Sequence, residues 1–179
     1  MGGRDKATLR IDGERIIDRQ LALLRQVAEP VFVVARGADR FPDLPIPVVC
    51  DLRPGAGPLG GIYTAILSSP RPRTLVVACD LPFLTRPLLE ELARPREADL
   101  VIPRSARGYE PLCAVWSAAC APAIRRRLDR GELTAALVAE DVRVEEIGPD
   151  ILGACDPRGL LFVNVNTPHD YERARGIRR

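Results

Sequence analysis

Short, continuously apolar runs alternate along this chain with longer stretches whose apolar residues recur at helical spacing. The runs Pro30–Ala35, Thr74–Cys79 and Leu160–Val165 are apolar at nearly every position, which is typical of strands buried on both faces. Between the strands, stretches such as Glu14–Ala28 place their apolar residues on one helical face. This alternation predicts an α/β fold with three α/β/α layers and a mostly parallel sheet.

The remaining elements follow the same pattern. Further strands are predicted at Thr8–Ile11, Ile46–Cys50, Asp99–Pro103, Pro111–Trp116 and Val142–Ile147. Further helices are predicted at about Leu59–Leu67, from Thr85 to about Ala93, at about Ala118–Arg130, and after Thr134 and Thr167. Asp12-Gly13 is predicted to form a turn, and Gly131 to end the helix before it.

The composition narrows the function classes. At 179 residues, residues 1–179 fit one domain. No apolar run approaches the length of a membrane span, and the first ten residues lack the apolar core of a signal peptide. With a net charge of +2 and 4% aromatic residues, the chain lacks the basic stripe and stacking rings of a nucleic-acid binder. We expect a cytoplasmic monomer that binds neither membrane nor nucleic acid.

The cysteines do not indicate a metal site. The five cysteines are scattered without a CxxC motif, and His169 is the only histidine. This pattern excludes a Cys/His zinc site at the usual spacing. We expect reduced, buried thiols, as in other cytosolic proteins.

Polar side chains follow three of the predicted strands, at the sheet edge where such folds bind ligands. Asp51 and Asp80 each follow a strand directly, and Asn164 and Asn166 alternate in the last strand, so both should point to one face. Asp80 suits a Mg²⁺ ion that also binds substrate phosphates, or it caps a turn. The Asp51 carboxylate is a candidate to accept hydrogen bonds from a guanine edge, to bind a ribose, or to cap a loop. The asparagines suit sugars, phosphates, metal-bound water or turn contacts.

A glycine-rich loop and a single lysine complete the candidate site. The segment RPGAGPLGG (residues 53–61) leaves the backbone bare beside a predicted helix N-terminus, which suits an anion or nucleotide as well as a tight turn. The 26 basic residues comprise 25 arginines and one lysine, Lys6. Because arginine does not replace a compact ammonium at a tight phosphate site, Lys6 is a candidate phosphate ligand, unless its survival is chance.

Four segments occur in an order and spacing shared with a known family. They are MGGRDKA (residues 1–7), GPLGGI (57–62), CDLPFL (79–84) and FVNVNTP (162–168). Together they resemble the molybdenum cofactor guanylyltransferases over nearly the whole chain. The resemblance implies a Rossmann-like nucleotidyltransferase fold of the glycosyltransferase-A type. It also implies transfer of GMP from GTP to molybdopterin that carries molybdenum, with molybdopterin guanine dinucleotide and pyrophosphate as products.

The resemblance also assigns roles to residues. It implies that Lys6 and Asp80 are catalytic, because Lys6 holds the phosphates and Asp80 binds Mg²⁺. The Lys6 ammonium and the Mg²⁺ ion offset the repulsion between the two polyanionic substrates. It further implies that Lys6, Asp51, Gly57 and Asp80 bind the nucleotide.

Asn164 and Asn166 match the family's asparagines near the reacting groups, and so become candidates for contact with the acceptor. GTP and the molybdopterin cofactor are the implied substrates. Other cofactor-biosynthesis proteins and target molybdoenzymes are implied partners. Two alternatives stay open: a molybdopterin cytidylyltransferase, and a catalytically silent nucleotide-binding domain.

The chain departs from the family pattern at its start. The family opens with an apolar strand and a glycine-rich segment ahead of the MGGRDKA motif, whereas this chain starts at Met1 of that motif. We therefore expect an N-terminally shortened domain with either an open slot between Val31–Ala35 and Leu75–Cys79 or a non-native rearrangement that closes it. Val31, Val33, Val76 and Val77 should border the slot. Lys6 should lie near its rim, and GTP binding should be weak.

Overall fold

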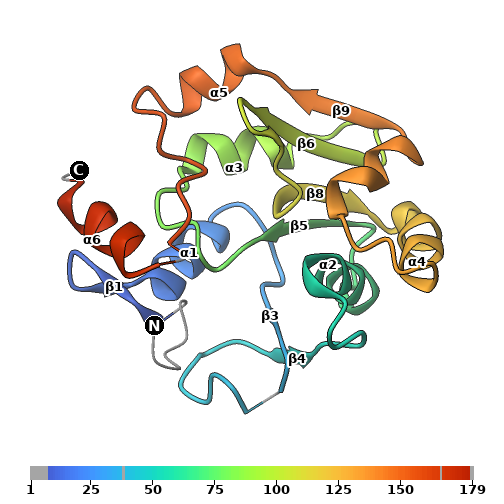
Figure 1. Cartoon of the computed structure of the whole chain (residues 1–179), viewed down its shortest axis with the longest axis horizontal. Helices are drawn as coiled ribbons and strands as arrows, with labels where there is room; N and C mark the ends of the chain where they lie inside the picture. Colours follow the sequence, from blue (N-terminus) through green and yellow to red (C-terminus); the bar gives the residue numbers. More distant parts are fainter. Residues whose placement is uncertain (1–7, 38, 166, 178–179) are drawn as a thin grey trace.

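The computed structural model describes residues 8–37, 39–165 and 167–177. Its largest sheet has five strands (Figure 1). In spatial order they are β5 (Arg73–Val77), β8 (Cys113–Ser117), β6 (Leu100–Ser105) and β9 (Val144–Ile147), with β7 (Gly108–Tyr109) forming a hairpin on β6. β8 pairs antiparallel with β5 and β6, whereas β9 pairs parallel with β6. Thus β5, β6 and β9 run in one direction, and β8 is reversed.

Two smaller sheets lie outside this one. β3 (Val33–Ala35) pairs parallel with β4 (Val48–Cys50). β1 (Arg10–Ile11) pairs antiparallel with β2 (Glu14–Arg15) around Asp12-Gly13. Both turn residues have positive φ, 52° and 82°, as a two-residue hairpin requires. The predicted turn is confirmed, and it explains why the first helix begins two residues later than predicted.

The helices lie where the apolar spacing predicts them, with shifted ends. They are α1 (Ile16–Leu24), α2 (Gly57–Ser68), α3 (Arg86–Ala93), α4 (Ala121–Asp129), α5 (Pro149–Cys155) and α6 (Pro168–Gly176), with 3₁₀ turns η2 (Ala118–Cys120) and η3 (Ala135–Glu140). The sequence did not predict α5, which is one short helix. Within the described ranges, no helix is long and apolar enough to cross a membrane.

Local capping signals are confirmed at three helix ends. The Thr85 side chain accepts a hydrogen bond from Leu88 N–H at the start of α3. Thr167 forms a reciprocal capping box with Asp170 at the start of α6. Gly131, with φ of 72°, follows the end of α4. These contacts satisfy backbone groups that a helix end leaves unpaired.

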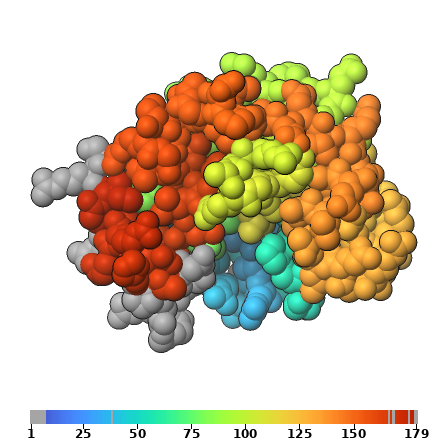
Figure 2. Space-filling model, turned by 45° about the horizontal axis from the view of Figure 1, so that its top comes forward, coloured from blue at the N-terminus to red at the C-terminus, as the bar shows by residue number. Residues whose placement is uncertain are grey.

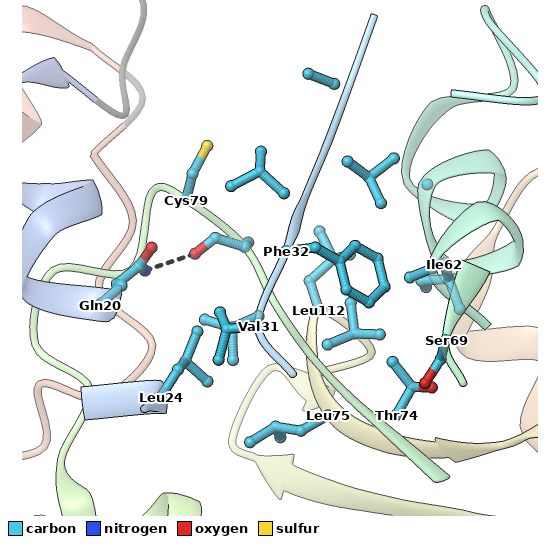
Figure 3. A pocket seen from close by; sticks show the side chains of 18 of the residues that line it. Gln20, Leu24, Val31, Phe32, Ile62, Ser69, Thr74, Leu75, Cys79 and Leu112 are labelled. Carbon is cyan, nitrogen blue, oxygen red and sulfur yellow. Dashed lines mark hydrogen bonds between the residues drawn. The ribbon is translucent and has the colours of Figure 1, made fainter. Parts of the chain in front are cut away.

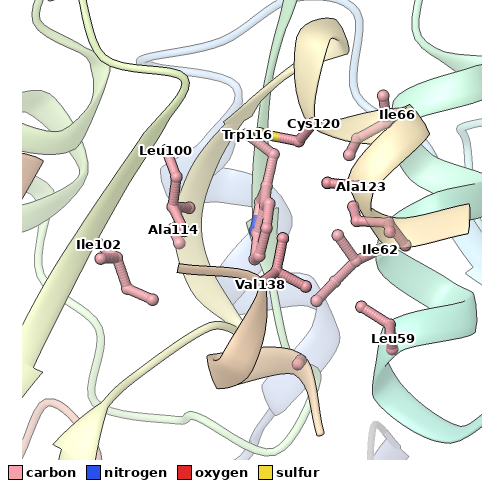
Figure 4. Packing of buried hydrophobic residues seen from close by; sticks show 12 residues of the cluster. Leu59, Ile62, Ile66, Leu100, Ile102, Ala114, Trp116, Cys120, Ala123 and Val138 are labelled. Atoms are coloured by element: carbon pink, nitrogen blue, oxygen red, sulfur yellow. The ribbon is translucent and has the colours of Figure 1, made fainter. Parts of the chain in front are cut away.

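Alternate residues of the central strands pack on opposite faces of the five-stranded sheet. Trp116 and Leu100 point into the cluster that α2 and α4 cover (Figure 4). Val115 and Val101 point into the cluster that α3 and α5 cover. All four side chains are at most 4% exposed. This period of two with helices on both faces is the predicted three-layer architecture.

The prediction of a strand at Leu160–Val165 is wrong. Val163 N–H donates to the Leu160 carbonyl (3.0 Å), which makes a turn, and Leu161 N–H donates to the Asp156 carboxylate (2.6 Å). The run is apolar because Leu161 and Val165 are buried in two separate clusters. An irregular segment wedged between packed elements has the same apolar content as a buried strand.

As predicted, β3 does not pair with β5, so β3 and β4 stay outside the five-stranded sheet. They pack on α1 through a separate cluster that includes Ile17 and Leu21. One side chain of α1 reaches across to the main sheet: the Gln20 amide donates to the carbonyls of Ala78 (2.7 Å) and Leu81 (3.0 Å). Gln20 is 6% exposed, so these are buried polar contacts.

We predict that Gln20→Ala lowers the free energy of unfolding by about 1–3 kcal/mol, because it leaves buried carbonyls without donors. Gln26→Ala is the matched control, since the exposed Gln26 amide contacts only the Ala22 carbonyl. It should change stability by less than about 0.5 kcal/mol. Urea unfolding of both variants measures the difference. Equal effects would show that Gln20 does not tie α1 to the sheet.

Candidate nucleotide and acceptor sites

A cavity of about 690 Å³ separates β3 from β5 (Figure 3). α1 contributes Gln20 and Leu24 to one wall, and α2 contributes Ile62 to another. We call this cavity the slot. Its walls are mostly apolar, and it runs from Glu29 and Arg73 at one end to Asp51 and Asp80 at the other.

The predicted borders of the slot are confirmed. Val31, Val33, Val76 and Val77 all line it. All four are only partly buried, whereas strands with neighbours on both edges bury such side chains fully. No hydrogen-bonded ladder joins β3 to β5 within residues 8–37 and 39–165.

Asp80 lies just beyond the end of β5 and is fixed by the C-terminal segment. Its carbonyl accepts a hydrogen bond from Val165 N–H (3.0 Å). Asn164 is therefore held next to the Asp80 turn, although it is not in a strand. Asn164 Oδ1 is buried and has no hydrogen-bond partner in the structure. A buried acceptor without a donor is costly, so this oxygen points to a ligand or a bound water.

The Asp51 carboxylate organises the glycine-rich loop. Asp51 Oδ1 accepts from Arg53 N–H (3.0 Å) and from the Thr64 hydroxyl (2.9 Å). Thr64 also accepts from Leu52 N–H (3.0 Å) and is fully buried. Asp51 thus ties the loop to α2 while its side chain lines the slot. These contacts match the loop-cap alternative, and both use Oδ1 of the carboxylate.

Two glycines set the start of α2. Gly57 has φ of +62°, a conformation that favours glycine. A Cβ on Gly60 would lie 2.8 Å from the Arg53 carbonyl oxygen, so the loop and helix approach closely only with glycine there. α2 begins at Gly57 without a side-chain cap. Pro58 has no N–H and Gly60 N–H donates to the Ala56 carbonyl (3.4 Å), so the first N–H groups that an anion can meet belong to Gly57 and Leu59.

A second hollow, of about 830 Å³, lies on the other side of Asn164. Arg107 and Arg173 line it together with Asn164. The β6–β7 hairpin forms one wall, and Figure 2 shows it in yellow-green against the orange and red C-terminal segments. Arg107 bridges the two, because it donates to the Phe162 carbonyl and to Glu110 (3.4 Å). We refer to this cavity, lined by Arg107, Asn164 and Arg173, as the second hollow.

The structure brings Asp51 and Asp80 to one end of the slot and places Asn164 beside Asp80. Gly57 opens the helix whose side chains line the same slot. Lys6 and Asn166 lie outside the described residues. Within the described part of the chain, no group of three or more His, Cys, Asp or Glu residues is arranged to hold a metal ion.

The cysteine prediction is right for some thiols and wrong for others. Cys113 and Cys120 are buried, and burial raises the pKa of Cys113 to about 12 and that of Cys120 to about 11. Both thiols therefore stay protonated at neutral pH. Cys50 and Cys79 are exposed, because they lie at the carboxyl ends of their strands, where the sheet is open.

Comparison with known proteins agrees with this geometry. Residues 1–144 match the family model described as MobA-like NTP transferase domain. The chain belongs to this family. A relative from Chloroflexus aggregans, named "Probable molybdenum cofactor guanylyltransferase", is 34% identical over 94% of this chain and 84% of its own length. A relative from Desulfosudis oleivorans, named "Molybdenum cofactor guanylyltransferase", is 32% identical over 97% of this chain and 87% of its own length.

A solved structure has the same fold. It is the molybdopterin-guanine dinucleotide biosynthesis protein A from Archaeoglobus fulgidus, with a TM-score of 0.80, 24% identity, and coverage of 97% of this chain and 90% of that one. The predicted Rossmann-like nucleotidyltransferase fold is confirmed.

Sequence reasoning missed Thr64 and Arg107. Thr64 was detectable as the one threonine in an otherwise apolar helix face, where a hydroxyl needs a partner. Arg107 carried no signal, because nothing in the sequence shows that its hairpin contacts Phe162.

We predict that Gly60→Ala destabilises the fold by about 1–3 kcal/mol, because the new methyl group meets backbone that does not move freely. Gly61→Ala is the matched control, since a Cβ at Gly61 meets no atom within 4 Å. It should stabilise the helix by about 0.5–1 kcal/mol. Thermal unfolding separates the two. A stable Gly60→Ala variant would contradict the close approach of loop and helix.

Proposed function

We propose that this chain is a nucleotidyltransferase that transfers GMP from GTP to the molybdopterin form of the molybdenum cofactor. The products are molybdopterin guanine dinucleotide and pyrophosphate. The observation that carries the proposal is that a single hydrogen bond, from Val165 N–H to the Asp80 carbonyl, joins the walls of two hollows. Asp80 lines the first and Asn164 lines the second. A transferase needs two substrates to meet at such a boundary.

The nucleotide is assigned to the carboxyl end of the slot. Asp51 lies there on a loop that its own carboxylate holds rigid. The N-terminus of α2, from Gly57, supplies the positive end of a helix dipole. Lys6 is the proposed ammonium for the phosphates, from the motif it belongs to.

The donor set at this edge fits a divalent cation, and Mg²⁺ is the ion we propose. Mg²⁺ is usually held by one or two carboxylates together with substrate phosphates, so a cluster of three acidic side chains is not needed. Asp80 provides the carboxylate. The buried, unpartnered Oδ1 of Asn164 provides a neutral oxygen close by. When bound, the ion neutralises phosphate charge at the reacting phosphorus.

The acceptor is assigned to the second hollow. Its volume of about 830 Å³ lies within the range of small-molecule sites. Arg107 and Arg173 contribute guanidinium groups, which recognise phosphate and planar polar groups. Asn164 lines this hollow next to the Asp80 turn, and Asn166 is a further proposed acceptor contact on the basis of its motif alone.

The chemistry requires positioning more than proton transfer. An oxygen of the acceptor's terminal phosphate forms a bond to the α-phosphorus of GTP, and the bond from that phosphorus to the bridging oxygen of pyrophosphate breaks. The nucleophile is already an anion, so no strong base is needed. Asp80 and Asn164 hold the reacting groups at the boundary of the two hollows, and Lys6 offsets charge on the leaving pyrophosphate.

We predict that Asp80→Asn lowers metal-dependent GMP transfer by at least about a hundredfold, similar to the loss of a single charge-stabilising group in other enzymes. Transfer of label from GTP to the loaded acceptor measures this. Glu90→Gln is the control, since Glu90 is an exposed carboxylate paired with Arg86 on α3, away from both hollows. It should keep full activity.

Two outcomes contradict the proposal. Full activity of Asp80→Asn would remove Asp80 from the site. Equal transfer from GTP and CTP, or a preference for CTP, would replace guanylyl transfer with the cytidylyl alternative. Titration calorimetry with GTP and CTP in the presence of Mg²⁺ gives the same comparison for binding alone.

A further inference from the structure

The segment of residues 160–165 borders the second hollow without belonging to a strand. Its Val165 N–H donates to the Asp80 carbonyl (3.0 Å), and its Leu161 N–H donates to the Asp156 carboxylate (2.6 Å). Asn164 lies between these two anchors along the chain. The backbone that carries Asn164 therefore owes its position to individual contacts rather than to a strand ladder.

A third anchor comes from the β6–β7 hairpin. The Arg107 guanidinium donates from Nη2 to the Phe162 carbonyl, two residues before Asn164. Figure 2 shows this hairpin against the orange and red C-terminal segments. Because the donor is charged, this contact is stronger than a hydrogen bond between two neutral groups. Arg107 thus fixes the chain before Asn164, and the Asp80 turn fixes the chain after it.

The turn that carries Arg107 is itself held by hydrogen bonds. The Ser105 hydroxyl accepts from Arg107 N–H (3.0 Å) and donates to the Glu110 carboxylate (2.7 Å). The same carboxylate oxygen accepts from Arg107 Nη2 (3.4 Å), and Glu110 N–H donates to the Pro103 carbonyl (3.0 Å) of β6. The guanidinium is therefore directed both by its own turn and by a neighbouring carboxylate.

Arg104 lies on the same hairpin and also lines the second hollow, but its contacts are elsewhere. It pairs with Glu146 of β9 (3.1 Å) and stacks on the Tyr109 ring, 5.3 Å from the centroid. Within residues 8–37, 39–165 and 167–177, no hydrogen bond joins Arg104 to the 160–165 segment. The side chains of Arg104 and Arg107 are similarly exposed, 57% and 60%. The two arginines thus differ mainly in the anchor to Phe162.

The position of Asn164 matters because of its side-chain oxygen. Asn164 Oδ1 is buried and has no hydrogen-bond partner within the described chain, so it is the polar atom of this segment that a ligand or ion can satisfy. Groups that act on a reacting substrate must be held within about 0.5 Å of their productive position. A segment without a ladder meets this requirement through its anchors.

We propose that Arg107 is a positioning residue for the transfer reaction, because its contact with the Phe162 carbonyl fixes Asn164 beside the Asp80 turn. This inference rests on the proposed function, in which Asn164 stands near the reacting groups. Glu110 and Ser105 support the role by directing the guanidinium.

Direct contact with the acceptor is the alternative role for Arg107. Both of its contacts with Phe162 and Glu110 use Nη2, so the rest of the guanidinium is open to a ligand in the second hollow. The two roles make different predictions. A positioning role acts through Asn164 and disappears without it, whereas a direct contact acts whether or not Asn164 is present.

The first measurement is amide hydrogen exchange of the whole chain without nucleotide or acceptor, so it does not depend on the proposed reaction. Arg107→Gln removes the charged donor and shortens the side chain. We expect the Val165 amide to exchange at least about tenfold faster, as loss of one hydrogen bond from a charged group predicts. The Leu89 amide of α3, which donates to the Thr85 carbonyl (3.3 Å), should not change.

Arg104→Gln is the matched control for hydrogen exchange. It removes the same charge from the same hairpin and leaves the contact between Arg107 and Phe162 in place. The Val165 amide should then exchange within about twofold of its rate in the unmodified chain, because surface substitutions away from a specific contact change stability little.

The second measurement is the single-turnover rate of GMP transfer, with enzyme in excess over acceptor so that slow variants stay measurable. We expect Arg107→Gln to lower the maximal rate at least about tenfold when Asn164 is present, and less than about twofold in the Asn164→Ala background. The GTP concentration for half-maximal rate should change less than about twofold, because Arg107 does not line the slot. Arg107→Lys keeps a cation near the Phe162 carbonyl and should recover at least about half of the rate.

Three outcomes would overturn the proposal. The first is unchanged exchange of the Val165 amide in Arg107→Gln, or an equal increase in Arg104→Gln. The second is an equal loss of rate with and without Asn164, which would make Arg107 a direct acceptor contact. The third is absence of GMP transfer by the unmodified chain. That result would overturn the proposed function as well, and it is distinguishable because the Val165 amide would still respond to Arg107→Gln.

Discussion

Backbone pairing at β5 divides this molecule into a five-stranded sheet on one side of the strand and a smaller unit of β3, β4 and α1 on the other. On one edge, β5 pairs with β8 and continues into a five-stranded sheet with helices on both faces. On the other edge it faces β3 across the slot without pairing. The unit of β3, β4 and α1 is consequently held to the main sheet by side chains, among which Gln20 makes buried hydrogen bonds to the turn after β5.

The candidate site depends on the same edge. Asp51 and Asp80 close one end of the slot, so the positions of the two carboxylates relative to each other depend on how β3 and β5 are spaced. Asp80 is further fixed from the other side by Val165. This arrangement places the slot and the second hollow, the proposed nucleotide and acceptor sites, on either side of one turn, with Asn164 lining the second hollow.

Patterns that depend on local or strand-level physics were predictable from the sequence. The apolar runs predicted β3, β5, β6 and β8, and the threonines predicted the caps of α3 and α6. The Asp-Gly pair predicted the turn at Asp12-Gly13. The position of the slot was predicted from the family resemblance. The segment Leu160–Val165 was not predictable, because its apolar residues serve two clusters and its backbone bonds to Asp156 and Asp80. The reversal of β8 and the position of Arg107 also depend on contacts between distant segments, which no local pattern encodes.

Residue-resolved amide hydrogen exchange measures the unpaired edge of β5 directly. Ala78 N–H donates to the Leu112 carbonyl just before β8, so even-numbered residues of this strand face β8 and odd-numbered residues face the slot. The account predicts alternation: the amides of Leu75 and Val77 exchange about a hundredfold faster than those of Val76 and Ala78. Phe32 and Val34 should likewise exchange faster than Val33. Equal protection of odd and even residues in β5 would show that its second edge is paired in solution, and would contradict the open slot.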